Sequence, residues 1–154
     1  MKLALRTSAW LILGTWTGAW VLFALVIAPT AFRVLPSSQA AGQLVGPVLE
    51  SLHLYGIAAG VALAGLSLVL RRGAWLTGIP LVLAALCGAS EFGVTSAIDA
   101  IRPQAFGQDA NPASAAQFAR LHEISRTLYS LVGAGLLALT VLQARADSPG
   151  VPER

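Results

Sequence analysis

The chain has 154 residues, a length typical of one domain. Hydrophobic residues make up 56% of it and charged residues only 11%, whereas about 25% of the residues of a soluble domain are charged. The net charge of +3 does not indicate nucleic-acid binding, because the basic residues stand singly or in pairs at the ends of apolar runs. The single cysteine, Cys87, excludes an intrachain disulfide and a multi-cysteine metal site. This composition indicates an integral membrane protein.

Four apolar runs reach, or nearly reach, the roughly 20 residues that cross a hydrocarbon core. We interpret them as helices, because a helix satisfies its backbone groups internally and no barrel-like alternation is present. The sequence therefore predicts an all-α, polytopic membrane protein with an antiparallel four-helix transmembrane domain over residues 1–146. The predicted transmembrane helices cover residues 8–32, 52–70, 74–98 and 124–144.

The connections between these helices differ in length. The tight turn Arg71–Gly73 makes the second and third helices antiparallel neighbours. The first connection runs to Ser51, and the third is turn-rich from Arg102 to Pro112. Residues 113–121 then extend the last helix, with Asn111 as its N-cap and Pro112 at its first position. We expect the tail, residues 147–154, to be disordered.

The distribution of basic residues predicts the orientation. With four spans both termini lie on one side of the membrane, and the basic residues of that side are Lys2, Arg6, Arg71, Arg72 and Arg145. On the opposite side Arg33, Arg102, Arg120 and Arg126 are mixed with acidic residues. The positive-inside rule then places both termini in the cytoplasm. An Arg-, Ala- and Gly-rich composition favours a bacterial plasma (inner) membrane.

Small residues recur at every fourth position in each predicted helix. Such residues let helices approach closely in a bilayer, where burying Leu against Leu gains little. We expect each set to lie at a helix contact, and Pro29 and Pro80 to bend their helices. The four sets are Gly14 and Gly18; Gly56, Gly60 and Ala64; Ala85, Ala89 and Gly93; and Ser130, Ala134 and Ala138.

Polar residues that are scattered in sequence fall at the same ends of the predicted helices. Antiparallel packing brings these ends together on the side opposite the termini. Glu91 is the deepest of the set, and a carboxylate at that depth needs a partner. We expect that partner to be Arg126 or Arg33. The candidate polar cluster consists of Arg33, His53, Glu91, Asp99, His122, Ser125 and Arg126.

Three interpretations compete for this cluster. The first is a structural lock of buried ion pairs. The second is a metal- or haem-binding site, with haem or copper held by His53 and His122 across the bundle. The third is a small transporter or proton-path subunit that titrates at Glu91. We expect no catalytic residues, because the sequence contains no nucleophile elbow, phosphate-binding loop or paired catalytic carboxylates.

Two short strings carry a family resemblance. One runs from Ala28-Pro29 into Phe32-Arg33-Val34-Leu35-Pro36, and the other is Phe118-Ala119-Arg120-Leu121-His122-Glu123-Ile124-Ser125. They resemble the family of small four-helix membrane proteins that includes transmembrane protein 205 and bacterial relatives described as a domain of unknown function. The bacterial relatives often carry Asn one turn after the serine, and residues 126–129 here contain none.

The resemblance implies the same four-helix topology and gives weight to Arg33, His122 and Ser125 as a recurring polar set. It implies no reaction. Our leading interpretation is an uncharacterised, non-enzymatic membrane protein. Its expected partners are the lipid bilayer and either a second copy or another membrane subunit, without a resident cofactor.

Overall fold

The computed structural model describes residues 2–106 and 111–148, and every regular element in these ranges is helical. Four continuous helical rods are long and apolar enough to span a membrane, which confirms the predicted all-α, four-helix class. The first rod consists of α1 (Lys2–Leu22), the π-helical turn η1 (Phe23–Ile27) and α2 (Ala28–Val34). The others are α3 (Ser38–Val69), then α4 (Ala74–Ala89) with η2 (Ser90–Thr95) and α5 (Ser96–Phe106), and finally α6 (Pro112–Asp147).

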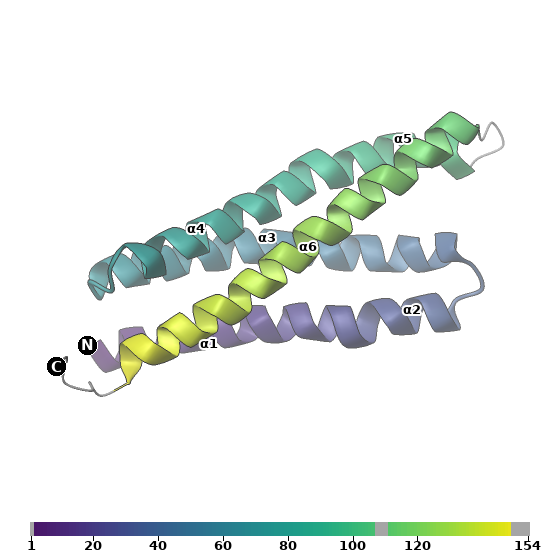
Figure 1. The fold of residues 1–154 in the computed structure, drawn as a ribbon. Helices are drawn as coiled ribbons and strands as arrows, with labels where there is room; N and C mark the ends of the chain where they lie inside the picture. Colours follow the sequence, from purple (N-terminus) through teal and green to yellow (C-terminus); the bar gives the residue numbers. More distant parts are fainter. Residues whose placement is uncertain (1, 107–110, 149–154) are drawn as a thin grey trace.

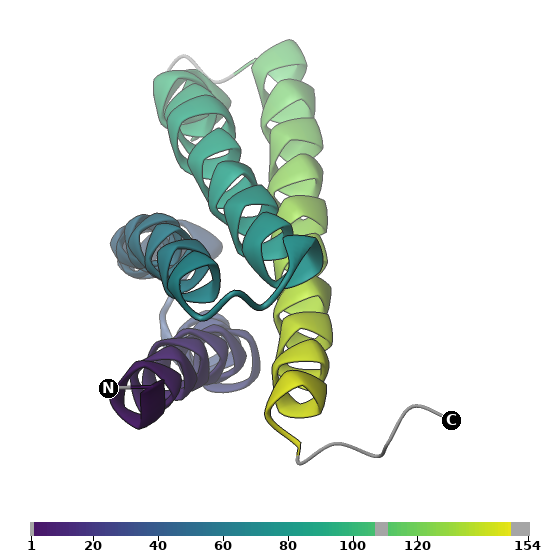
Figure 2. The same ribbon diagram turned by 90° about the vertical axis from the view of Figure 1, so that its left-hand side faces the viewer.

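The rods are arranged as a bundle in which α3 lies between α1 and α4 (Figures 1 and 2). The α3–α4 contact is the most extensive, as the tight turn predicts; Arg71 (φ 55°) and Gly73 (φ 86°) reverse the chain there. Helix α6 crosses obliquely, packing on α4, η2 and α5 and also on α1. The start of α1 and the end of α6 lie at one end, which we call the terminal end; the opposite end, with the α2–α3 connection, is the distal end.

The helices are longer than the predicted spans at the distal end. Helix α3 begins at Ser38 rather than near residue 52, with the Ser37 hydroxyl accepting a hydrogen bond from the Ala40 N–H. The third rod continues to Phe106, through the predicted turn region that begins at Arg102. A rod of 32 residues is about 48 Å long and exceeds a hydrocarbon core of roughly 30 Å. Hydropathy therefore detected only the most apolar part of each helix.

The start of α6 agrees with its sequence signals. Asn111 is the N-cap, its side-chain oxygen accepts from the Ser114 N–H at 2.8 Å, and Pro112 occupies the first turn. The predicted tail, residues 147–154, begins too early, because Asp147 is still helical and is held by contacts with other helices. Residues 149–154 lie outside the described residues.

Only the second of the four small-residue sets lies at a helix contact within the bundle. A Cβ added to Gly60 would lie 2.5 Å from the Pro80 carbonyl oxygen and 2.8 Å from Ala84 Cβ, so the α3 and α4 backbones are in direct contact. The residues that face outward are Gly14, Gly18, Ala85, Ala89, Gly93, Ser130, Ala134 and Ala138. The prediction for those three sets was wrong.

Large side chains explain why α1 buries a different face. Its buried residues recur at helical spacing and are Ala9, Leu13, Trp16, Trp20 and Phe23, the last lying in η1. The indole rings of Trp16 and Trp20 fill the space between the rods, so the opposite face, with Gly14 and Gly18, points outward. Aromatic volume, rather than close backbone approach, therefore fixes the position of α1.

A single carboxylate joins three rods at the terminal end. Asp147 Oδ1 accepts from Arg72 Nη2 at 2.6 Å and lies 3.5 Å from Arg6 Nε. Asp147 Oδ2 accepts from the Trp10 indole N–H at 2.9 Å. We call Arg6, Trp10, Arg72 and Asp147 the terminal clamp. It ties α1 and the α3–α4 turn to the end of α6.

The Gly60 contact can be tested by adding one methyl group. Gly60→Ala should destabilise the bundle by roughly 1–3 kcal/mol, because the Cβ forces the backbones of α3 and α4 apart. Gly65→Ala is the matched control on α3, since a Cβ at Gly65 meets nothing within 4 Å. Denaturant unfolding in mixed micelles measures both. Equal stability of the two variants would contradict the close contact.

The terminal clamp makes a second prediction. Asp147→Asn leaves Arg72 partly buried without its counter-ion, and removing one partner of a fully buried pair costs about 3–5 kcal/mol. We expect a smaller loss, roughly 2 kcal/mol, because the clamp lies near the membrane surface. Glu123→Gln, which breaks the exposed Glu123–Arg126 pair, should change the unfolding free energy by less than about 1 kcal/mol. The same unfolding assay compares them, and an Asp147→Asn loss no larger than the control's would refute the clamp.

Candidate functional site

A buried acid–base pair lies between α3 and the third rod. His53 Nδ1 lies 3.0 Å from Glu91 Oε2. His53 is 1% exposed and Glu91 is 9% exposed. Because hydrocarbon offers no hydrogen bonds, two such groups persist there only when they satisfy each other. They are the central residues of the candidate site.

The pair lies far along the bundle from the terminal end. His53 and Glu91 are equally far in sequence from Arg72, on opposite sides of the α3–α4 turn. At 1.5 Å per residue this separation is about 28 Å, close to the whole thickness of a hydrocarbon core. The pair therefore lies about one core thickness from Arg72 along the bundle, and its distal neighbours along the chain include Glu50 and Asp99.

The π-helical turn η2 (Ser90–Thr95) presents Glu91. The Ser96 N–H donates to the Glu91 carbonyl five residues earlier, and the Ser96 hydroxyl donates to the same oxygen at 3.3 Å. A π-turn inserts an extra residue and so rotates the following helix face. Glu91 can thus face α3 while Ile98 and Ala105 of α5 remain buried. Such turns occur frequently at functional sites.

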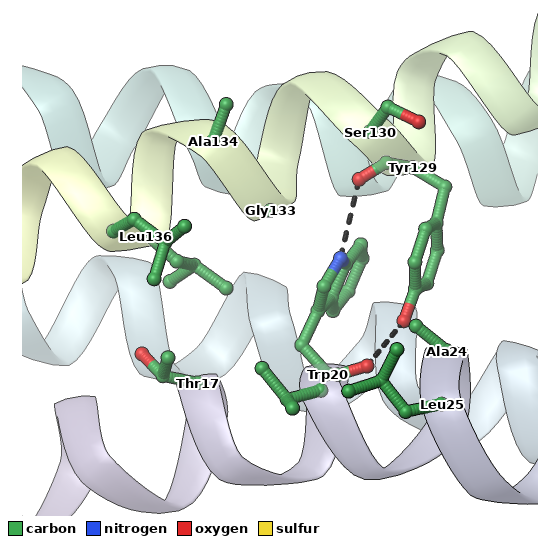
Figure 3. A pocket seen from close by; sticks show the side chains of 11 residues that line it. Thr17, Trp20, Ala24, Leu25, Tyr129, Ser130, Gly133, Ala134 and Leu136 are labelled. Carbon is green, nitrogen blue, oxygen red and sulfur yellow. Dashed lines mark hydrogen bonds between the residues drawn. The ribbon is translucent and has the colours of Figure 1, made fainter.

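Trp20 of α1 lies against His53, and Tyr129 of α6 stacks on Trp20. The rings of Trp20 and His53 lie 6.0 Å apart, and the rings of Trp20 and Tyr129 are stacked at 4.3 Å. The Trp20 indole N–H donates to the Tyr129 carbonyl at 3.2 Å, and the Tyr129 hydroxyl donates to the Trp20 carbonyl (Figure 3). This reciprocal pair links α1 to α6 beside the site.

A shallow groove of about 250 Å³ lies on the outer side of this aromatic pair, between α1 and α6. Figure 3 shows Trp20 and Tyr129 in its wall, together with the small residues Ala24, Gly133 and Ala134. The lining is almost entirely apolar. The aromatic pair thus separates a lipid-facing groove from the buried histidine.

Two further polar atoms near the pair have no hydrogen-bond partner in the described part of the chain. They are Ser90 Oγ, adjacent in sequence to Glu91, and the Trp16 indole nitrogen. A Cβ built at Gly56, one turn from His53, would lie 3.0 Å from that nitrogen and 2.8 Å from Cys87 Sγ. Hydrogen-bonding groups without a partner therefore lie near the pair on the first and third rods.

The structure does not bring the predicted polar cluster together as one site. Glu91 pairs with His53, not with Arg126 or Arg33, while Arg126 pairs with Glu123 one turn away on α6. The Glu123 and Arg126 side chains are 68–69% exposed and lie on the outside of the helix, away from Glu91. An i,i+3 neighbour on the same face is a readier partner than a residue on another rod.

The remaining members of the predicted cluster have separate environments. Asp99 pairs with Arg102 on α5 at 3.1 Å. Arg33 is exposed at the end of α2, and Ser125 is buried on α6. His122 is exposed, and its ring stacks on Phe118.

The metal- or haem-binding alternative needs His53 and His122 to face each other, but one ring is buried against Glu91 and the other is exposed against Phe118. Among residues 2–106 and 111–148, no three His, Cys, Asp or Glu side chains are grouped as ligands of a metal ion. The geometry gives no support to the haem or copper interpretation.

Sequence reasoning missed Trp20, Tyr129 and Ser90. The spacing of the aromatic residues in α1, with Trp16, Trp20 and Phe23 on one face, could have identified the buried face of that helix. Nothing in the sequence indicates the π-turns, although Pro29 follows η1, where the Ala28 N–H donates to the Phe23 carbonyl.

Residues 11–106 match the protein family described as Domain of unknown function (DUF4149). No curated protein and no solved structure matches the chain. The matched region covers most of the first rod and the whole second and third rods, with both His53 and Glu91, and includes more than half of the 154 residues. The chain therefore belongs to the DUF4149 family, as a multi-pass membrane protein with four helices able to cross the bilayer.

Proposed function

We propose that the protein is a non-enzymatic membrane subunit whose His53–Glu91 pair takes up and releases a proton from the distal side of the membrane. The single observation that carries this proposal is the direct contact between a buried imidazole and a buried carboxylate, 3.0 Å apart, in an otherwise apolar bundle. An ionisable residue inside a membrane is rare and is most often functional.

The chemistry of the two groups suits proton exchange. A proton shared between imidazole and carboxylate leaves the pair without net charge, whether it resides on nitrogen or on oxygen. Gain or loss of one proton leaves a net charge in a low-dielectric interior, where charge is unfavourable. The protonation state of the pair is therefore linked to access of water or to a change in the surrounding helices.

Access from one side is supported by the distribution of ionisable residues. No Asp, Glu, His, Lys or Arg occurs in residues 7–20, 54–70, 73–90 or 127–144, which form the bundle between the pair and the terminal end. Distal to the pair, by contrast, α3, α5 and α6 carry Glu50, Asp99 and Glu123. This pattern favours a one-sided proton site over a complete path through a single chain.

The non-enzymatic part of the proposal rests on the hydroxyl groups. The Ser130 hydroxyl donates to the Arg126 carbonyl within its own helix, and the Thr127 hydroxyl donates to the Glu123 carbonyl. Nucleophilic catalysis needs a hydroxyl or thiol within hydrogen-bond reach of its base. No such pair occurs among the hydrogen bonds of the described residues.

The proposed location is a bacterial inner membrane, with both termini in the cytoplasm. The strings around Phe32–Pro36 and Phe118–Ser125 support kinship with the transmembrane protein 205 group, and the composition supports a bacterial inner membrane. The excess of basic residues at the terminal end supports cytoplasmic termini. The distal side would then be periplasmic, and a second copy or another membrane subunit would complete any transport path.

Infrared difference spectroscopy on the protein in lipid vesicles tests the proton site. We expect changing the pH on the distal side to alter one carboxylic acid C=O band. That band should disappear in Glu91→Gln, whose amide can still hydrogen-bond to His53, and persist in the control Glu123→Gln.

The same experiment separates proton exchange from a purely structural lock. A lock predicts that Glu91→Gln changes thermal stability while neither the parent nor the variant has a pH-dependent carboxyl band. Absence of the band in folded parent protein, or its persistence in Glu91→Gln, would refute the proposed function.

A further inference from the structure

The terminal end carries more positive charge than its own residues neutralise. Its basic residues are Lys2, Arg6, Arg71, Arg72 and Arg145, and Asp147 is the only acidic residue there within residues 2–148. The Asp147 carboxylate already serves Arg6, Arg72 and Trp10. This end of the bundle therefore attracts anions beyond the carboxylate that it contains.

Two buried donors, one within the terminal clamp and one a helical turn from it, lack acceptors among the described residues. The Arg72 side chain is 7% exposed, and its Nη1 atom has no hydrogen-bond partner although Nη2 donates to Asp147. Gln143 is 3% exposed, and its amide nitrogen also has no partner. Gln143 precedes Asp147 by one turn, so both project from the same face of α6. Buried donors without a partner call for an acceptor that the described residues do not supply.

Two tryptophans indicate the depth of this cluster. Trp10 donates to Asp147, and Trp75, at the start of α4, is largely exposed. Indole rings concentrate at the level of the lipid headgroups. The acceptor that is most abundant at that level is the phosphate group of a phospholipid, which guanidinium groups bind in a bidentate manner.

We propose that the terminal end of the bundle binds the phosphate group of an anionic phospholipid through Arg6, Arg72 and Gln143. Arg6 is the entry point, because half of its side chain is exposed and only its Nε atom approaches Asp147. Arg72 and Gln143 form the inner part of the site and contribute the two donors that lack acceptors. Basic pockets between transmembrane helices recognise headgroups in this way.

Thermal unfolding of the full chain in neutral detergent, with added lipid, tests the site. Phosphatidylglycerol should raise the unfolding temperature in a concentration-dependent manner, and phosphatidylcholine should not. Arg6→Gln should weaken the apparent affinity for phosphatidylglycerol about tenfold, since a charge-assisted hydrogen bond is lost. Arg126→Gln, at an exposed arginine of the distal end, is the matched control and should leave the lipid response unchanged.

Gln143→Met provides a second variant that keeps the side-chain volume and removes the unpaired amide. In neutral detergent it should be at least as stable as the parent, and it should lose most of the phosphatidylglycerol response. Equal responses to the two lipids, or equal behaviour of Arg6→Gln and Arg126→Gln, would overturn the site. A full response in Gln143→Met would do the same, and a full response to inorganic phosphate alone would overturn the assignment to lipid.

Discussion

Hydrocarbon provides no hydrogen bonds, so a polar group that this chain carries into the membrane is unfavourable there unless another group bonds to it. The backbone meets this requirement by forming helices throughout the four rods. His53 and Glu91 meet it with each other, across the contact between α3 and the third rod. The arrangement of the bundle around these two residues follows from that requirement, because α3 and η2 must remain in contact for the pair to form.

The α3–α4 hairpin supplies the rigid support for this contact. Gly60 lets the α3 backbone rest on Pro80 and Ala84, and Gly56 does the same for Cys87 nearer the site. Helix α1 is held differently, by the large rings of Trp16 and Trp20 and by the reciprocal hydrogen bonds of Trp20 and Tyr129. The terminal clamp fixes the opposite end of α1 and α6. Close backbone packing, aromatic volume and a shared carboxylate thus each secure a different part of the bundle.

The sequence predicted the class, the four spans, the α3–α4 hairpin and the start of α6, because hydropathy, Gly and the Asn-Pro signal act locally. It also selected His53 and Glu91 as candidate site residues. The sequence could not predict that these two residues pair with each other. The π-helical turn η2 changes which side chains of the third rod face α3, and no residue pattern indicates that turn. Asp147 was assigned to the tail because three of its neighbours in space, Arg6, Trp10 and Arg72, are remote in sequence. The prediction that every small-residue set lies at a helix contact failed because Gly and Ala also occur on the outward faces of these helices.

The central claim is that one imidazole and one carboxylate touch inside the membrane, and solid-state NMR in lipid bilayers measures that contact directly. A His122→Gln protein with ¹⁵N-labelled histidine and ¹³C-labelled glutamate contains one labelled imidazole, that of His53. We expect a short-range ¹⁵N–¹³C dipolar coupling from the His53 ring to a side-chain carboxyl, lost when Glu91→Gln is added. Absence of the coupling in folded protein, or its survival in the Glu91→Gln protein, would contradict the account.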